Sequence, residues 1–311
     1  MDRYIQFYQH LPEHINPNIS FGFISFSWYS IMYLVTFLVV YLLVKYRIKK
    51  NEISNFEFRI SNKDQMTECS ISKLNHSKLF QNSKFKIQNS EYLLDFLLYA
   101  FVGLIVGARL GEVFFYNFSY YAAHPIQIIS PFDPVTHRFI GIYGMSYHGG
   151  LIGVVIAGWL WAKKNNINLL NWFNFIVPAI PAGYFFGRIG NFINGELYGR
   201  ATTGWWGMYF PNDYMHELRN PSQLYEAFLE GIILFVILWL LRNKKWAKDN
   251  MLAFYLSGYA IARIISEFFR DPDGWIGFLT LGQFYSLLMV PTAFLVFLNT
   301  KKSGIIKSEK K

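Results

Sequence analysis

The amino-acid sequence predicts an all-α polytopic membrane protein with about seven transmembrane helices, an outward-facing site and an ordered connection on the outer side. Composition is the first observation, because 53% of the residues are hydrophobic, 20% are aromatic and only 16% are charged, against about 25% charged in soluble domains. The second is a series of apolar runs of membrane length, since roughly 20 apolar residues cross the hydrocarbon. The third is the position of the 18 lysines, which all lie in residues 45–86, 163–164, 244–248 and 301–311.

The apolar runs predict the helices in order. They lie near residues 24–44, 92–116, 141–162, 169–188, 223–241, 252–269 and 279–298. Polar connections after the first, third, fifth and seventh runs carry the lysines, and the positive-inside bias places such loops in the cytosol. The N-terminus is then expected outside and the C-terminus inside. The first run lacks a basic leader and a small-residue cleavage site, so we expect an uncleaved helix.

Two connections are longer than the rest. Residues 46–91 are rich in Asn, Ser and Lys, which predicts a mobile polar cytosolic insert. Residues 189–222 are dense in Gly, Trp, Tyr and Arg, which predicts an ordered interfacial element with short amphipathic pieces on the outer side. The lone Cys69 excludes a disulfide framework and a thiolate metal site. The net charge of +9 sits in juxtamembrane clusters, so no nucleic-acid partner is expected.

Charged side chains are predicted at one depth below the outer surface. Arg109, His148 and Arg263 each lie about seven residues inside the outer end of a helix, and Arg188 ends the fourth helix at that face. Arginine presents a planar fork of donors suited to phosphate. Buried charge in a membrane is costly and usually marks a site. The alternative is that each arginine extends separately to the interface.

The stretch GRIGNFINGELYGR at residues 187–200 carries the strongest motif. Arg188 and Asn191 share a helical face by i, i+3 spacing, and Gly195 and Gly199 are expected to break the helix around Glu196. A lipid-facing helix has no use for an arginine, two asparagines and a glutamate in nine residues. The motif therefore indicates function more than packing.

A second motif, YAIARIISEFFRDPD, covers residues 259–273. Tyr259, Arg263 and Glu267 form an i, i+4, i+8 stripe on one helical face. Glu267 can hold Arg263 by a charge-assisted hydrogen bond, which lowers the cost of burying the arginine and fixes its fork. A purely structural ion pair is the alternative.

Two further pieces carry polar groups to the outer ends of helices. In GMSYHGGLIG (144–153), glycines flank His148, and a neutral imidazole can take a proton near pH 7. A hydrogen-bonded core histidine is the alternative. NPSQLYEAFLEG (220–231) carries Gln223, Tyr225 and Glu226 into the fifth helix, where Gln223 and Glu226 could instead cap the helix.

Together these pieces, with SWYSIMYL near Tyr29, GARLG and PSQLYEA, resemble bacterial prolipoprotein diacylglyceryl transferases along nearly all membrane segments. The resemblance implies a single transmembrane catalytic domain over residues 1–311 in the bacterial cytoplasmic (inner) membrane. It implies transfer of a diacylglyceryl group from phosphatidylglycerol to the lipobox cysteine thiol of a prolipoprotein, with release of glycerol 1-phosphate. Phosphatidylglycerol and the signal peptide with its cysteine are then the partners, and a monomer is expected.

The resemblance also assigns residues. Arg188 and Arg263 take the part of essential arginines on the lipid phosphate, and His148 that of the base. The expected substrate-binding residues are Tyr29, Arg109, Asn191, Asn194, Glu196, Gly199, Gln223, Tyr225, Glu226, Tyr259, Glu267 and Arg270. The chain departs from the family where it has Asn220 before PSQLYEA, usually histidine, and Glu112, usually aromatic. Its first cytosolic loop is also longer than is usual in the family.

The residues suit this chemistry. A free thiol has a pKa of about 8.5, so a base or a positive field must supply thiolate, and His148 could be that base. The reaction also needs a stabilised leaving phosphate, which arginines aimed at the departing oxyanion supply. No metal and no cofactor is expected, because the sequence has no P-loop and His216-Glu217 lacks the second histidine of HExxH.

Two other classes fit parts of the pattern. An intramembrane protease would use Ser146 beside His148, although the spacing differs from a GxSxG elbow. A lipid transporter would need paired broken helices or an internal repeat, and the sequence shows neither.

Overall fold

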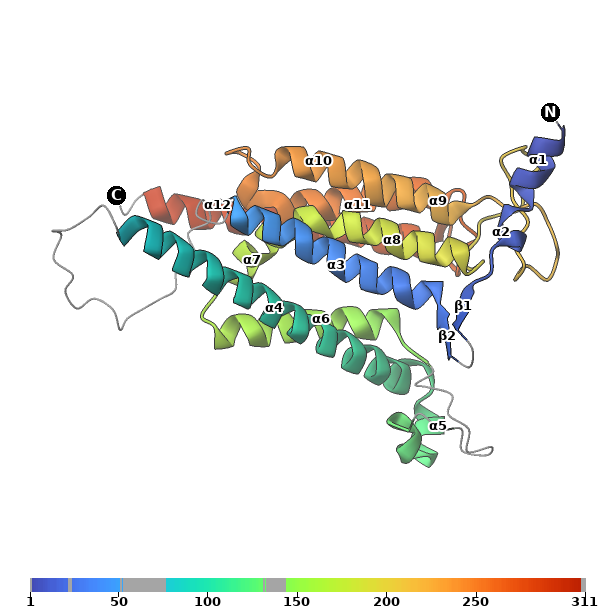
Figure 1. The fold of residues 1–311 in the computed structure, drawn as a ribbon, viewed down its shortest axis with the longest axis horizontal. Coiled ribbons are helices and arrows are strands. Elements are labelled where there is room, and N and C mark those ends of the chain that lie inside the picture. The colour runs from blue at the N-terminus through green and yellow to red at the C-terminus, as the bar shows by residue number, and fades with distance from the viewer. Residues whose placement is uncertain are drawn as a thin grey trace. The chain divides into compact units, whose positions relative to one another are not determined.

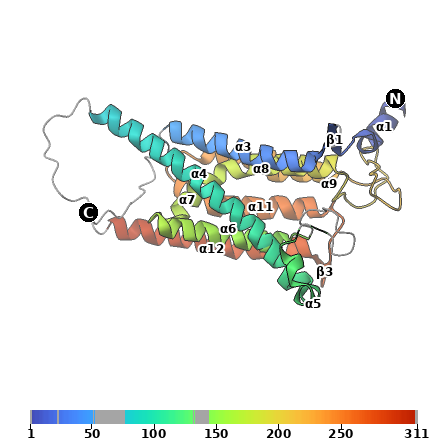
Figure 2. The ribbon, with the colours of Figure 1, turned by 60° about the horizontal axis from the view of Figure 1, so that its bottom comes forward.

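The computed structural model describes residues 2–21, 24–50, 52, 77–130, 132 and 144–308. The chain forms two compact units, one of residues 1–56 and 170–311 and the other of residues 57–169. Figures 1 and 2 show the elements of both from two directions.

The first unit begins with short elements ahead of its first long helix. These are α1 (Asp2–Gln9), α2 (Leu11–His14) and an antiparallel hairpin of β1 (Asn18–Phe21) and β2 (Ile24–Ser27). The Ser27 hydroxyl accepts a hydrogen bond from the Tyr29 backbone N–H at 3.2 Å, and this N-cap starts α3 (Trp28–Lys49). The sequence predicts helix from residue 24, so the structure corrects that start to residue 28.

The remaining helices of this unit run in three stretches. The first is α7 (Leu169–Ile176), η4 (Val177–Ala179) and α8 (Ile180–Ile193), and the second is α9 (Ser222–Glu226), the π-helix η5 (Ala227–Ile233) and α10 (Leu234–Leu241). The third holds η6 (Lys248–Asn250), α11 (Met251–Glu267), the strands β3 (Trp275–Ile276) and β4 (Leu279–Thr280), and α12 (Leu281–Ser308).

Helices α3, α8, α10 and α11 lie side by side in the first unit (Figures 1 and 2). α3 packs against α8, α8 against η5, and α11 against both α10 and α12. An apolar core of Val177, Leu234, Leu238, Ala247 and Met251 joins three of these stretches. The end of this bundle that carries the C-terminus of α8 and the N-terminus of α9 is called the site end.

A buried charge cluster joins helices at the opposite end. Arg47, at the C-terminus of α3, donates to Glu52 at 2.7 Å and to the Phe175 carbonyl oxygen. Arg242, just after α10, lies 3.3 Å from the same Glu52 carboxylate. Because Arg47 is fully buried, this carboxylate is the counter-charge that allows the arginine to stay there.

The second unit is built on two helices. These are α4 (Ser77–Gly111), continued by the π-helix η2 (Glu112–Tyr116), and α6 (Tyr147–Lys164), with α5 (Phe118–Ala123) and η3 (Pro125–Ile128) between them. Glycines allow the close crossing of α4 and α6, because a Cβ added at Gly153 would lie 2.0 Å from the Gly103 carbonyl oxygen. An apolar groove of about 670 Å³ follows this crossing.

Five helical stretches of the described chain are long and apolar enough to cross a membrane. They are Trp28–Lys49, Glu91–Tyr116, Leu169–Ile193, Ser222–Leu241 and Leu281–Thr300. The other two predicted spans are helical as α6 and α11, outside this set of five. The fold class is therefore confirmed, while the number seven stays a prediction.

The two long connections differ from the sequence prediction. α4 begins at Ser77, so the last part of the predicted polar insert is helical, while residues 53–76 lie outside the described residues. No helix forms between residues 194 and 221, so any amphipathic piece of this connection is not helical. Arg219 instead pairs in bridges with Ala201 and Met208, so backbone pairing orders this connection.

Candidate functional site

The functional motif at residues 187–200 occupies the C-terminal end of α8. The helix ends at Ile193, and Gly195 follows with φ of +65°, a left-handed conformation that glycine adopts without strain. Arg188 Nη1 donates to Asn191 Oδ1 at 3.4 Å. The predicted shared face of Arg188 and Asn191 and the helix break before Glu196 are both confirmed.

This break turns Glu196 back toward the helix. Its two carboxylate oxygens accept hydrogen bonds from Asn191 Nδ2 at 2.7 Å and from Asn194 Nδ2 at 3.0 Å. Gln223 Nε2 donates to the Glu196 carbonyl oxygen at 2.6 Å from the neighbouring helix α9. The Tyr29 hydroxyl lies 3.0 Å from the Tyr33 hydroxyl, so three of the predicted polar residues, Asn191, Asn194 and Gln223, meet around Glu196.

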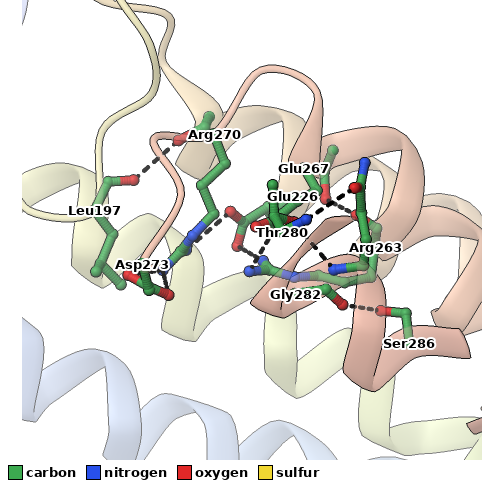
Figure 3. A network of polar contacts seen from close by, with 12 residues as sticks. Leu197, Glu226, Arg263, Glu267, Arg270, Asp273, Thr280, Gly282 and Ser286 are labelled. Atoms are coloured by element: carbon green, nitrogen blue, oxygen red, sulfur yellow. Dashed lines mark hydrogen bonds and ion pairs between the residues drawn. The ribbon is translucent and has the colours of Figure 1, made fainter. Parts of the chain in front are cut away.

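Glu226, the last residue of α9, is the centre of a second cluster. Its carboxylate lies 2.7 Å from Arg188, 3.2 Å from Arg263 and 3.2 Å from Arg270. Figure 3 shows both Arg263 and Arg270 reaching the Glu226 carboxylate. Glu226 is fully buried, whereas the side chains of Arg188 and Arg263 are 15% and 11% exposed. The carboxylate therefore lies beneath the arginines, which present the accessible face.

Glu267 completes this cluster from α11. Its Oε2 lies 2.8 Å from Arg263 Nη2, so the predicted i, i+4 pair is confirmed. The Glu267 carboxylate also packs on the first turn of α12, where a Cβ at Gly282 would lie 2.4 Å from Oε2 (Figure 3). A glycine at this position is what lets the carboxylate reach both the helix and the arginine.

Three further polar residues of the cluster are absent from the sequence prediction. Tyr184 Oη accepts from Arg188 Nε at 2.7 Å and donates to Glu230 Oε2 at 2.5 Å. Ser266 Oγ donates to Glu230 Oε1 at 2.8 Å. Two of these had a signal in the sequence, because Tyr184 is four residues before Arg188 and Glu230 is four residues after Glu226.

The other predicted residues of this unit lie around these clusters. Gly199 sits where two chain segments cross, because an added Cβ would lie 2.1 Å from the Phe269 carbonyl oxygen. Its N–H donates to the Asn220 carbonyl oxygen at 2.8 Å. The Tyr225 ring packs edge-on against Phe269, and the Tyr259 ring packs edge-on against Tyr184. Gly199 thus shapes the backbone, while the two tyrosines pack beside the cluster.

Arg109 and His148 belong to the second unit. Arg109 donates to the backbone carbonyl oxygens of Ile128 at 2.7 Å, Gln127 at 2.5 Å and Gly144 at 3.2 Å. These contacts tie the residues after α5 and the start of the α6 segment to α4. His148 is exposed in the first turn of α6, with its Nδ1 3.5 Å from the Tyr116 hydroxyl. Their predicted convergence with the arginines of the first unit stays a prediction.

Three positions bear on the alternatives and departures. Ser146 is buried and its Oγ accepts from the Gly149 N–H at 3.1 Å, so it caps α6. Asn220 accepts from Trp206 Nε1 at 3.1 Å and donates to the Arg200 carbonyl oxygen at 3.0 Å, which makes it part of the backbone crossing. Glu112 accepts from Asn117 Nδ2 at 2.7 Å. In the described part of the chain, no group of three His, Cys, Asp or Glu side chains could hold a metal.

An ion pair orders the connection between α8 and α9. Arg219 Nε donates to Asp213 Oδ2 at 2.8 Å, and Nη2 donates to Oδ1 at 3.1 Å. This fork–fork contact holds the pKa of the Asp213 carboxyl below its usual value. The Met215 and Glu217 N–H groups donate to the same carboxylate, so one side chain fixes the whole turn.

Known proteins that are similar to this chain match it along almost its whole length. A family model described as prolipoprotein diacylglyceryl transferase matches residues 66–299. A phosphatidylglycerol–prolipoprotein diacylglyceryl transferase of Chlorobaculum tepidum is 41% identical over 290 residues, covering 91% of this chain and 89% of that protein. A protein of the same name from Campylobacter jejuni is 37% identical over 305 residues, covering 96% and 98%. Another, from Wolinella succinogenes, is 46% identical over 207 residues, covering 65% and 74%.

Proposed function

This chain belongs to the prolipoprotein diacylglyceryl transferase family, and we propose that it transfers the diacylglyceryl group of phosphatidylglycerol to the lipobox cysteine of a prolipoprotein. In this reaction the cysteine sulfur forms a bond to the carbon of the diacylglyceryl group that bears the phosphate. The bond between that carbon and the phosphate oxygen breaks. The products are a thioether and glycerol 1-phosphate. A base takes the thiol proton, and the glycerol phosphate departs with the oxygen and the electron pair of the broken bond.

The observation that carries the proposal is the arrangement of Arg188 and Arg263 over the buried Glu226 carboxylate. The shared carboxylate holds two guanidinium groups side by side from different helices, and both remain partly accessible. Arginine forks bind phosphate oxygens in a bidentate manner, and donors fixed in place before reaction stabilise a developing oxyanion. Arg188 and Arg263 therefore hold the phosphate of the lipid as it becomes the leaving group.

The Glu196 cluster supplies a second wall of this site. Asn191 links the two clusters, because its Oδ1 accepts from Arg188 and its Nδ2 donates to Glu196. Asn194 donates to the same carboxylate, and Gln223 donates to the Glu196 backbone carbonyl oxygen. This polar wall suits the glycerol hydroxyls of the headgroup, which both donate and accept hydrogen bonds.

His148 takes the thiol proton in this proposal. Its exposed imidazole at the start of α6 is accessible, and a neutral imidazole can accept a proton near pH 7. Arg109 holds the residues that precede α6 in place through the backbone carbonyl oxygens of Gln127, Ile128 and Gly144.

The protein works as a monomer in the bacterial cytoplasmic membrane, with its N-terminus in the periplasm and its C-terminus in the cytosol. The support for this orientation is the distribution of the lysines, because translocated loops are depleted of them. The site end then faces the periplasm, where a prolipoprotein presents its lipobox. The polar insert predicted at residues 46–91 would then lie on the cytosolic side, away from the chemistry.

The experiment is a reconstitution with purified full-length protein. Phosphatidylglycerol with a labelled headgroup and a lipobox peptide should yield a diacylglyceryl thioether by mass spectrometry and equimolar labelled glycerol phosphate. A peptide with serine in place of cysteine is the matched control and should yield neither. Release of glycerol phosphate without thioether would contradict the proposal, because it would indicate hydrolysis.

A further inference from the structure

Glu230 is a fully buried carboxylate that the proposed chemistry does not use directly. It lies in the middle of the π-helix η5, four residues after Glu226. Both of its oxygens accept hydrogen bonds, one from Tyr184 on α8 at 2.5 Å and one from Ser266 on α11 at 2.8 Å. One carboxylate thus joins the two helices that carry Arg188 and Arg263.

The contact with Tyr184 continues to Arg188. Arg188 Nε donates to the Tyr184 hydroxyl at 2.7 Å, and the guanidinium lies 4.9 Å from the centre of the same ring. A hydroxyl has one proton to donate, and an ionised carboxylate can only accept. Glu230 therefore accepts the hydrogen bond that the Tyr184 hydroxyl donates, which leaves the hydroxyl lone pairs facing Arg188. The tyrosine supports the guanidinium by its ring and orients it by its oxygen.

Backbone packing places these groups together. Gly231, next to Glu230, has no side chain between η5 and α8, and an added Cβ would lie 2.9 Å from Phe185 Cβ. Phe185 is the neighbour of Tyr184, so this close approach brings the Tyr184 hydroxyl within reach of Glu230. Single π-turns inside α-helices are frequent at functional sites, and here the π-turn holds Glu230.

The contact with Ser266 reaches Arg263 in the same indirect way. Ser266 Oγ lies within hydrogen-bond distance of the Arg263 carbonyl oxygen, at 3.1 Å, while Glu230 Oε1 is 4.0 Å from Arg263 Nη1. That distance is too long for a direct hydrogen bond. Glu230 reaches Arg188 through the Tyr184 hydroxyl and holds Ser266 on the helical turn that follows Arg263. Glu226 contacts both arginines directly, and Glu267 contacts Arg263.

We propose that Glu230 is a positioning residue that orients Arg188 through the Tyr184 hydroxyl and steadies the α11 turn of Arg263 through Ser266. This inference rests on the proposed function, because it assigns Glu230 and Tyr184 to the geometry of the phosphate-binding arginines. Groups that orient a ligating side chain in this way are typically worth about 10- to 100-fold in activity when removed.

The test variant is Tyr184→Phe, which keeps the ring under Arg188 and removes only the hydroxyl. We expect kcat for thioether formation to fall about 10- to 100-fold, with KM for phosphatidylglycerol changed much less, because orientation matters most in the transition state. Tyr99→Phe is the matched control. It removes the hydroxyl that Lys164 contacts at 3.2 Å on the other unit, and it should keep the wild-type rate.

A double-mutant cycle separates positioning from a structural role. If Tyr184 acts through Arg188, then adding Tyr184→Phe to Arg188→Lys should cost little more than Arg188→Lys alone. Glu230→Gln keeps the size of the side chain but cannot accept from both hydroxyls as the carboxylate does. It should show the same loss in kcat and the same lack of additivity, and it carries the test if Tyr184→Phe inserts poorly.

Two results would overturn the inference. One is a wild-type kcat in Tyr184→Phe and Glu230→Gln, and the other is a loss that multiplies fully with that of Arg188→Lys. The proposed function fails by a different result, namely the absence of thioether from the wild-type protein. An active wild-type protein with unaffected Tyr184→Phe therefore rejects the positioning role alone.

Discussion

Gly282→Ala is the sharpest steric test of the arginine cluster, because one methyl group would meet the carboxylate that holds Arg263. The added Cβ would lie 2.4 Å from Glu267 Oε2, 2.5 Å from Cδ and 2.7 Å from Oε1. All three atoms are at the end of a flexible side chain. We therefore expect the glutamate to move while α12 keeps its place.

The size of the effect follows from these distances. Ordinary contact begins near 3.4 Å, so Glu267 must retreat by about 1 Å, which takes a hydrogen bond out of range. The 2.8 Å contact with Arg263 is then lost, and Arg263 keeps Glu226 as its nearest partner. A misplacement of about 1 Å in a catalytic group can cost about 100-fold in rate. We expect kcat/KM to fall by that order.

The assay is thioether formation by purified Gly282→Ala in detergent or vesicles, with yield and thermal midpoint measured beside it. Ser286→Ala is the control, because it lies one turn further into α12 and removes only the hydroxyl that contacts the Gly282 carbonyl oxygen (Figure 3). The control should stay within about twofold of the wild-type rate, since the change adds no atom to the cluster. A Gly282→Ala protein with full activity would refute the claim that Glu267 fixes Arg263.

Four further predictions address other parts of the molecule. His148→Asn should lose activity that returns as the pH rises toward the pKa of the acceptor thiol, since the thiol then ionises by itself; a loss that is the same at every pH would reject His148 as the base. The Asp213 carboxyl has a lowered pKa in the folded state, so its contribution to stability is present above the usual aspartate pKa and is lost as the pH falls through the lowered value. Proteolysis of residues 196–220 should therefore increase in acid for the wild type. Asp213→Asn should already be as sensitive at neutral pH as the wild type is in acid, and equal protection of both proteins at neutral pH would contradict this. Glu52→Gln leaves two arginines without their shared counter-charge and should cost about 3–5 kcal/mol, read as a lower thermal midpoint with normal activity at low temperature; an unchanged midpoint would show that the cluster does not stabilise the bundle. Replacing residues 53–76 with a short Gly/Ser linker should leave thioether formation intact, and loss of activity in a protein that still inserts would count against a passive insert.

Much of the fold could be predicted because membrane helices are set by local composition. Each predicted span contains a helix in the part of the chain that the structure describes, and Ser27 caps α3. The strand at residues 24–27 could not be predicted in the same way. It depends on pairing with residues 18–21, and an apolar run of this length does not distinguish a strand from a helix end. The π-helices also depend on packing, since Gly231 meets Phe185 across two helices.

In the site, too, contacts within one helix could be predicted from the sequence and contacts between helices could not. Contacts within one helix were predicted, as with the pair of Arg263 and Glu267, because i, i+4 spacing determines them. Contacts between helices were not, and Glu226 is the main example. Its residue type and position indicated a site, but spacing gives no sign that three arginines share its carboxylate. The Tyr184 contact with Glu230 is of the same kind, since 46 residues separate the two.

The central claim is that two arginine forks, held by one buried carboxylate, stabilise the departing phosphate. The most direct measurement is the rate of labelled glycerol phosphate release by Arg188→Lys and Arg263→Lys across a range of pH. Lysine keeps the charge but not the fork, so each variant should lose about 100- to 1000-fold at every pH, as when a single oxyanion donor is removed. Near-normal release by either lysine variant would contradict the claim, because charge alone would then be enough.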